Sequence, residues 1–336
     1  MWLVLLISLA CAKAQHVNDT VFSVVRATPL SDDHLRLFNS LYKDSHKYDL
    51  DFWKSPTGVG YSVDIMAPEE KITSLRTIFE QSGIPSNVTI ADVQKLIIDR
   101  EQKTTKSSLS SWKLGLGSFF KRVKDDPPTT TNRAKYRFGE YSSYGEIVRW
   151  LNEISQEYPN IAKVSSIGTT FEGRNIIAIK IGRDPSRNDK RVVWIDGGIH
   201  AREWGAIHTA LYFIEQLIVG YGSDPIITSY VDNLSFFIVP VVNPDGFEYT
   251  RSDITPMKRL WRKNRAGITC NKDQWFRDRC CGGVDLNRNF DFHWGGAGSS
   301  DDACSEIYQG TTAFSELESR AIRDTMLAPE LYGKVG

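Results

Sequence analysis

Apolar and polar positions between residues 20 and 103 switch between strand-like and helical periods. The stretches "VFSVVRA", "YDLDFW", "GYSVDIM" and "VTI" have the composition and alternation of strands. In "SDDHLRLFNSLYK" and "PEEKITSLRTIFE" apolar residues recur three and four places apart, as in helices, and "ADVQKLIIDR" predicts a further helix. The order strand–helix–strand–strand–helix–strand predicts a small α+β domain of ferredoxin-like type, with an antiparallel sheet and its helices on one face.

From residue 136 the pattern is typical of an α/β domain. The stretch "SSYGEIVRWLNEISQEYP" predicts a helix that begins with a capping box between Ser143 and Glu146. Apolar residues at helical spacing predict two more helices, from Trp204 to Val219 and from Ser315 to Met326.

The same part of the chain contains four predicted strands. Three lie at 163–167, 176–181 and 192–196. The fourth, "LSFFIVPVV" (234–242), is almost continuously apolar, as expected for a strand buried on both faces. The tetrapeptide "NPDG" that follows it is expected to turn the chain.

Residues 104–135 change in composition to Ser, Thr, Lys, Gly and Pro, which predicts an exposed linker between the two domains. Its basic residues would be targets for a trypsin-like protease, although a plain solvated tether would have the same composition. These residues are Lys121, Arg122, Lys124, Arg133 and Lys135.

The chain begins with a short apolar run, "MWLVLLISLA", and small residues follow in the pattern Ala12, Lys13, Ala14. This pattern predicts a secretory signal peptide over residues 1–14 and hence a secreted, extracellular protein. A buried strand or an anchor is the alternative. The run is too short to span a bilayer, and no later run is long enough, so no membrane association is expected.

The net charge of the chain bears on its possible partners. The 41 basic and 41 acidic residues cancel, and neither half carries a large basic block, so nucleic acid is not an expected partner.

With Cys11 in the signal peptide, four cysteines remain, and an even number in a secreted chain suggests two disulfides. Asn-x-Ser/Thr sequons begin at Asn18, Asn87 and Asn233, and the last is expected to be less accessible because an apolar strand follows it.

His200 and Glu203, in "GGIHAREW", follow the apolar run "VVWID" at the carboxyl end of a predicted strand, where α/β sheets hold their sites. Imidazole nitrogen and carboxylate oxygen are both good zinc ligands, and a catalytic zinc typically takes three protein ligands. An H-x-x-E pair alone more often marks the start of a surface helix. The context therefore makes these two residues candidate ligands whose third partner must be found elsewhere.

Two further polar stretches suit a peptidase site. An arginine in "RLWRKNR" (259–265) could stabilise an oxyanion on a peptide carbonyl. In "GGVDLNRNFD" (282–291), Asn287 and Arg288 could clamp a carboxylate, and Asp285 could orient a metal-bound histidine. A solvated basic face and a polar loop are the alternative interpretations.

The motifs "TFEGR", "GGIHAREW", "NPDGF", "RLWRKNR", "GGVDLNRNF" and "CSEIYQG" occur in the order found in secreted zinc carboxypeptidases of the A/B type, which the chain resembles. Residues 20–103, with "LDFW", resemble the activation propeptide of that family, and residues 136–336 its catalytic domain. The resemblance implies a mixed-sheet α/β/α catalytic domain and a monomeric zymogen. It also implies Zn²⁺ as cofactor and the C-termini of peptides or proteins as substrates.

The resemblance also implies a role for each matching residue. His200 and Glu203 would be zinc ligands, and Asp285 would orient His200. Arg262 would polarise the scissile carbonyl. The substrate-binding residues would be Arg202 and Arg259 in the cleft and Asn287 and Arg288 at the terminal carboxylate. Cys281 and Cys304 would form the family's disulfide, which leaves Cys270 and Cys280 for a second one.

The third zinc ligand of that family, a histidine, and its general-base glutamate come later in sequence than the position of Gly336, and neither has a counterpart here. We therefore expect an incomplete catalytic domain that is inactive as it stands. Two ligands hold zinc weakly, and general-base help is typically worth ~10²–10⁴-fold in rate.

Two other functions are considered. A truncated, non-catalytic isoform with an intact propeptide would inhibit or regulate full-length carboxypeptidases. A small-molecule amidohydrolase or deacylase could use the same scaffold, but the secretory signal, the propeptide and the carboxylate clamp favour a peptidase.

Overall fold

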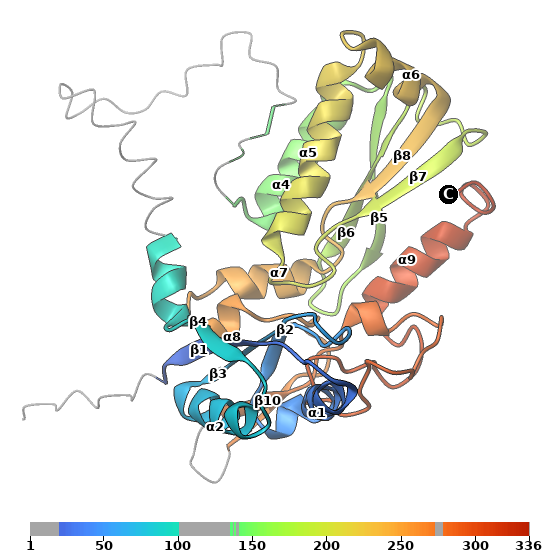
Figure 1. The fold of residues 1–336 in the computed structure, drawn as a ribbon. Helices are drawn as coiled ribbons and strands as arrows, with labels where there is room; N and C mark the ends of the chain where they lie inside the picture. Colours follow the sequence, from blue (N-terminus) through green and yellow to red (C-terminus); the bar gives the residue numbers. More distant parts are fainter. Residues whose placement is uncertain (1–19, 101–134, 137, 139–140, 273–277, 336) are drawn as a thin grey trace, which may run out of the picture.

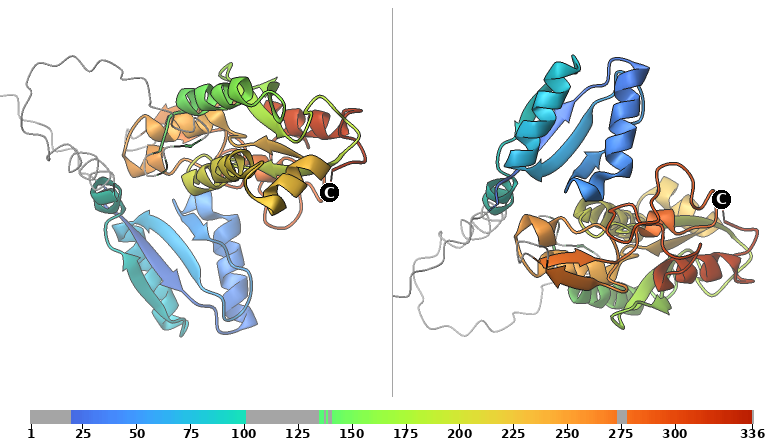
Figure 2. Two further views of the ribbon diagram at one scale, coloured as in Figure 1. Left: turned by 90° about the horizontal axis from the view of Figure 1, so that it is seen from above. Right: turned by 90° about the horizontal axis from the view of Figure 1, so that it is seen from below.

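The computed structural model describes residues 20–100, 135–136, 138, 141–272 and 278–335, with only the backbone at 270–272 and 278–280. The predicted signal peptide and almost all of the predicted linker lie outside these ranges, as does the sequon at Asn18. Figure 1 shows an N-terminal unit, in blue to teal, below a larger unit that runs from green to red. Figure 2 shows, from above and below, that the N-terminal unit lies against one side of the larger one.

The N-terminal unit has the predicted order of strands and helices. Its four strands form one antiparallel sheet in the order β2-β3-β1-β4. Helix α1 begins after Ser31, whose side chain accepts a hydrogen bond from the backbone N–H of His34. The elements are β1 (Phe22–Ala27), α1 (Asp32–Lys43), η1 (Ser45–Lys47), β2 (Asp51–Lys54), β3 (Val63–Pro68), α2 (Glu69–Gln81) and β4 (Ser86–Ile90).

The two helices of the predicted order, α1 and α2, share one face of this sheet as expected, and a later helix covers the other face. The core under α1 and α2 includes Phe38, Phe79 and Val25. A further helix at 93–100 packs on the opposite face, where Val93 contacts a cluster that contains Val24. Successive β1 residues point to opposite faces, and both Val24 and Val25 are apolar, so each face needs a cover.

The larger unit is built on a mixed four-stranded sheet in the order β5-β6-β8-β7. Its strands are β5 (Ala162–Thr169), β6 (Asn175–Ile181), β7 (Arg191–Asp196) and β8 (Leu234–Val239). The pairs β5–β6 and β6–β8 are antiparallel, whereas β7 and β8 are parallel. Strand β8 lies between β6 and β7, and its residues 235–239 are buried, as predicted for the run that begins at Leu234.

Helices cover the two faces of this sheet and complete three layers (Figure 1). On one face α4 (Tyr144–Glu157) and α5 (Trp204–Gly220) bury Ile147 and Leu211 against strand residues such as Ile179. On the other, α9 (Leu317–Leu327) buries Ile322 close to Val239. The capping box predicted at the start of α4 is present.

The tetrapeptide "NPDG" starts a helix instead of making a turn. It forms the first turn of α7 (Pro244–Arg251), where the Asn243 side chain accepts a hydrogen bond of 2.9 Å from the backbone N–H of Gly246. Asparagine is a good N-cap and proline suits the first helical position, so the same residues serve a helix start as well as a turn.

Five shorter elements complete the larger unit: α6 (Pro225–Asn233), α8 (Pro256–Arg259), β9 (Thr269–Lys272), β10 (Asp278–Cys281) and η2 (Leu286–Arg288). Within the described ranges, no helix has the length and apolar character needed to cross a membrane.

Candidate active site

Two glycines bring the candidate ligands to the carboxyl end of β7. A Cβ atom on Gly197 would stand 2.9 Å from the backbone oxygens of both Ala206 and Pro240, so only glycine allows this approach. Gly198 has a φ of +61°, in the left-handed region. The chain then passes through His200 and enters α5, with Glu203 as the N-cap residue.

Backbone hydrogen bonds join the three polar stretches that the sequence singled out. The N–H of Ala201 donates to the oxygen of Arg262 at 2.9 Å, and the N–H of Asn264 donates to the oxygen of Val284 at 3.0 Å. Segments separated by about sixty and twenty residues along the chain therefore meet at one edge of the sheet.

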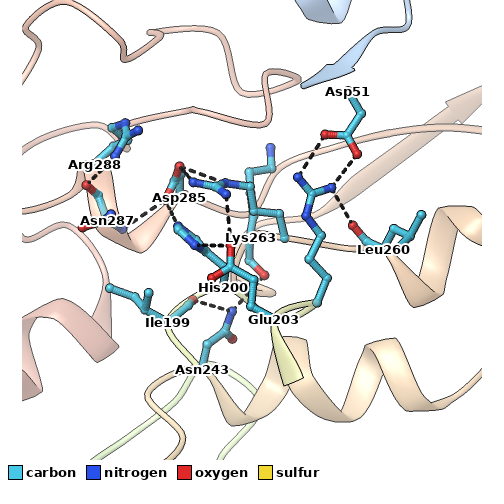
Figure 3. A network of polar contacts seen from close by, with 12 residues as sticks. Asp51, Ile199, His200, Glu203, Asn243, Leu260, Lys263, Asp285, Asn287 and Arg288 are labelled. Atoms are coloured by element: carbon cyan, nitrogen blue, oxygen red, sulfur yellow. Dashed lines mark hydrogen bonds and ion pairs between the residues drawn. The ribbon is translucent and has the colours of Figure 1, made fainter. Parts of the chain in front are cut away.

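His200 lies between two carboxylates (Figure 3). Its Nε2 is 3.1 Å from Asp285 Oδ1, and its Nδ1 is 2.9 Å from Glu203 Oε1. The side chain of Asp285 is fully buried, whereas that of Glu203 is 48% exposed. The buried carboxylate therefore fixes one ring nitrogen, and the other faces Glu203 on the open side of the site.

Electrostatics favour the charged forms of these groups. Burial alone would raise the pKa of Asp285, but the hydrogen bond from His200 and the charge of Arg262 hold it well below its ordinary value. Burial alone would lower the pKa of His200, but its hydrogen bonds with Asp285 and Glu203 give a net rise. The hydrogen bond with His200 lowers the pKa of Glu203.

Arg262 contacts both carboxylates. Its Nε and Nη2 donate to Asp285 Oδ2 at 3.2 and 3.0 Å, and its Nη1 is 3.6 Å from Glu203 Oε1. The structure thus brings His200, Glu203, Asp285 and Arg262 into one contact network.

Asn287 and Arg288 lie on η2, and Asn287 touches this network through its backbone. The backbone N–H of Asn287 donates to Asp285 Oδ1 at 3.0 Å. Arg288 Nε donates to the oxygen of Gly298 at 2.9 Å, and its Nη1 donates to the oxygen of Asn287 at 3.0 Å. In Figure 3 both residues lie on one side of Asp285, and Asp51 lies on the opposite side of His200.

Arg202 reaches the N-terminal unit. Its Nη2 donates to Asp51 Oδ1 at 3.0 Å and its Nη1 to Asp51 Oδ2, while Nη1 also donates to the oxygen of Leu260 at 3.1 Å. The Arg259 guanidinium stacks 3.6 Å from the ring centroid of Trp204, and its Nη1 donates to the oxygen of Arg202 at 3.3 Å.

Sequence reasoning missed two buried polar residues and one contact. Lys263 is buried and donates from Nζ to the oxygens of Ala303 and Ser305, both at 2.9 Å. Asn243 Nδ2 donates to the oxygen of Lys263 at 3.0 Å. The Asp51–Arg202 contact joins residues 151 positions apart, and no local pattern reveals such a pairing.

The structure also places the four cysteines and two further histidines, His208 and His293. Cys281 and Cys304 form a disulfide. Cys270 and Cys280 lie opposite each other in the pairing of β9 with β10, but their side chains lie outside the described part. His208 on α5 packs against the ring of Tyr141, and His293 is exposed on a loop.

Comparisons with known proteins define the class. Residues 147–334 match the family model described as zinc carboxypeptidase, and residues 25–100 match that of the carboxypeptidase activation peptide. The chain therefore belongs to the zinc carboxypeptidase family, as its motifs indicated. Because the second match covers the N-terminal unit, we call residues 20–100 the prosegment.

The relatives agree with this assignment. Rat carboxypeptidase A2 is 31% identical over 319 residues, which cover 95% of this chain and 66% of the relative. Pig carboxypeptidase A1 is 33% identical over 282 residues, which cover 84% of this chain and 59% of the relative. The chain thus spans about two thirds or less of the length of these curated relatives.

Solved structures confirm the carboxypeptidase-like fold. The crystal structure of carboxypeptidase A from Helicoverpa armigera superposes with a TM-score of 0.74 at 28% identity, over 92% of this chain and 66% of that one. Thrombin activatable fibrinolysis inhibitor superposes with a TM-score of 0.68 at 28% identity, over 94% of this chain and 70% of that one.

Proposed function

We propose that the chain belongs to the zymogen of a secreted zinc-dependent carboxypeptidase that removes C-terminal residues from peptides and proteins. The observation that carries this proposal is the setting of His200. One ring nitrogen is held by buried Asp285, and the other faces Glu203 at 2.9 Å. A metal ligand supported by a carboxylate on its second nitrogen is the usual arrangement at zinc sites.

The residues present fit two positions of a zinc site. When Nε2 of His200 donates its hydrogen to Asp285, Nδ1 keeps a free lone pair beside the Glu203 carboxylate, and both are ligand types that zinc prefers. Bound zinc would polarise a carbonyl and lower the pKa of a water molecule. Within the described ranges, no group of three such side chains is found.

Arg262 is the proposed donor to the carbonyl oxygen of the scissile bond. Its guanidinium borders Glu203, and Asp285 holds it through two hydrogen bonds, so it is oriented before substrate arrives. We assign the terminal carboxylate of the substrate to Asn287 and Arg288, because arginine and amide donors next to such a site recognise a carboxylate. This assignment would restrict the reaction to the last residue of a peptide.

The prosegment is proposed to keep the zymogen inactive. Asp51 occupies the guanidinium of Arg202, which is one of the proposed cleft residues. Two other contacts support the docking: His46 Nε2 is 2.8 Å from Asp302 Oδ2, and Gln94 Nε2 donates to the oxygen of Ile254 at 3.1 Å. Cleavage of the linker at 104–135 by a trypsin-like protease would release this cover after secretion.

The alternative is a non-catalytic regulator of full-length carboxypeptidases. The presence of the prosegment, which matches the carboxypeptidase activation peptide over residues 25–100, is compatible with this alternative. In that case this chain would be inactive as it stands.

One experiment separates the two functions. We would sequence the transcript past the codon for Gly336, express the full translated product and treat it with trypsin. We would then offer it a peptide with a free C-terminal carboxylate and the same peptide amidated. The proposal expects release of the last residue from the free peptide only, with loss of activity in His200→Ala but not in His208→Ala.

Equal cleavage of the amidated peptide would contradict the carboxylate assignment. If the message stops after Gly336 and the product is inactive but inhibits an active carboxypeptidase A at low concentration, the regulator is the correct function.

A further inference from the structure

The sequon at Asn87 lies on β4, an edge strand of the prosegment, and among the described residues β4 pairs with β1 alone. Asn87 and Thr89 are both exposed with the prosegment docked on the larger unit. Among the described residues, the Asn87 side chain makes no hydrogen bond. A carbohydrate on its amide nitrogen would therefore displace no described contact.

The sequon at Asn233 is placed differently. The Asn233 Nδ2 donates to the oxygen of Ser229 at 2.8 Å, at the C-terminal end of α6. Its third residue, Ser235, is 2% exposed within the central strand β8. A carbohydrate there would break the side-chain bond at the end of the helix, next to the buried sheet.

The sequence of strand β4 also lacks the residues that usually protect a sheet edge. Its sequence, "SNVTI", contains no charged residue and no proline, and Val88 is 38% exposed. Exposed, uncharged edge strands are ready templates for pairing with another chain. The opposite edge, β2, carries Asp51 and Lys54, and Asp51 is engaged by Arg202.

We propose that Asn87 is an N-glycosylation site and that its glycan shields the β4 edge until the prosegment is released. This inference rests on the proposed secretion, because the modification occurs in the secretory pathway. In the reaction the Asn87 amide nitrogen bonds to the anomeric carbon of a lipid diphosphate-linked oligosaccharide. The bond from that carbon to the phosphate oxygen breaks, the amide loses one proton, and the lipid diphosphate leaves.

Site mapping is the first test. The full chain would be expressed in a secreting eukaryotic cell line. The molecular mass of each secreted variant would be measured by mass spectrometry before and after enzymatic deglycosylation. We expect Asn87→Gln and Thr89→Ala to lose the mass of one glycan. Thr89→Ser keeps the sequon and should keep the glycan. Asn233→Gln should leave the glycan mass of the protein unchanged. Asn18→Gln separates any contribution from the first sequon.

A secreted chain with its signal peptide removed and Asn87 unmodified would overturn this inference and leave the proposed function intact. A chain retained in the cell with its signal peptide uncut would overturn the proposed secretion, and this inference with it.

Edge protection is tested by a matched pair of substitutions. Thr89→Ala and Thr89→Lys both remove the sequon, but only the second places a charge on the edge. In size-exclusion chromatography, the fraction of protein that elutes as oligomers should rise for Thr89→Ala and Asn87→Gln. It should fall back to the wild-type level for Thr89→Lys. An Asn87→Gln variant that stays as monomeric as the glycosylated wild type would refute the shielding role.

Discussion

Asp51 and Arg202 form a two-point ion pair that connects the prosegment to the proposed substrate cleft. Both side chains are largely buried, at 15% and 11% exposure, and Arg202 also donates to the oxygen of Leu260. Dissolved salt should therefore weaken this contact between the prosegment and the cleft less than it would weaken an exposed ion pair.

Asp51→Ala should loosen this docking. The change leaves the Arg202 guanidinium in a mostly buried place without its counter-ion, and truncating one partner of such a pair costs about 2–5 kcal/mol. We expect trypsin to cut the linker faster in the variant, as followed by gel electrophoresis. The matched control is Asp33→Ala, which removes an exposed pair with Arg36 and should leave the cleavage rate unchanged.

Asp285→Asn should weaken zinc binding about 10–100-fold, the usual effect of losing a partner that supports a ligand. An amide facing His200 can donate to Nε2, which would place the ring hydrogen on Nδ1 and remove its lone pair. Competition with a chromophoric chelator measures the affinity. Asp291→Asn, an exposed carboxylate close in sequence, should bind zinc like the wild type, and equal weakening by both changes would argue against the orienting role.

Glu318 should make stability depend on pH. Burial raises its pKa to about 7, against hydrogen bonds that include one from Asn264, and its Oε1 has no hydrogen-bond partner within the described ranges. A carboxyl group with a raised pKa stabilises the fold while it is protonated. That stability is lost as the pH rises through about 7.

The resulting loss between pH 5 and 8 should be on the order of 3 kcal/mol. Glu318→Gln, which is neutral at every pH, should flatten this dependence, as measured from the midpoints of urea unfolding. Glu153→Gln, on the exposed face of α4, is the control and should keep the wild-type slope.

The Cys281–Cys304 disulfide should stabilise the loop beside the site. It closes a separation of 23 residues, for which loss of the bond costs roughly 3 kcal/mol. The double variant Cys281→Ala/Cys304→Ala should therefore unfold at lower urea concentration.

A second disulfide between Cys270 and Cys280 remains a prediction. It is supported by their opposite positions in the pairing of β9 with β10. Thiol titration of the secreted, unfolded chain checks it: no free thiol is expected, and two free thiols would contradict the pairing.

Local patterns predicted local structure well. The capping box of Ser143 and Glu146 involves neighbours in sequence, and the apolar run of β8 shows its double burial directly. Asn243 was misjudged because asparagine followed by proline is compatible with a turn and with a helix start, and packing decides between them.

The site could be predicted only in part. Motifs singled out His200, Glu203, Asp285 and Arg262, and the structure brings these four side chains together. Pairings between units, such as Asp51 with Arg202, depend on how two folded bodies dock, and no periodicity in either body encodes that. The burial of Lys263 could not be predicted from the basic residues around it, because it depends on a loop some forty residues further along the chain.

Because one carboxylate serves both His200 and Arg262, the two cannot vary independently during evolution or design. A substitution at position 285 that changes the setting of the proposed metal ligand, His200, must also disturb Arg262. Changes at 200, 262 and 285 should therefore be strongly epistatic, and adapting this scaffold to another metal or reaction would require replacing all three together.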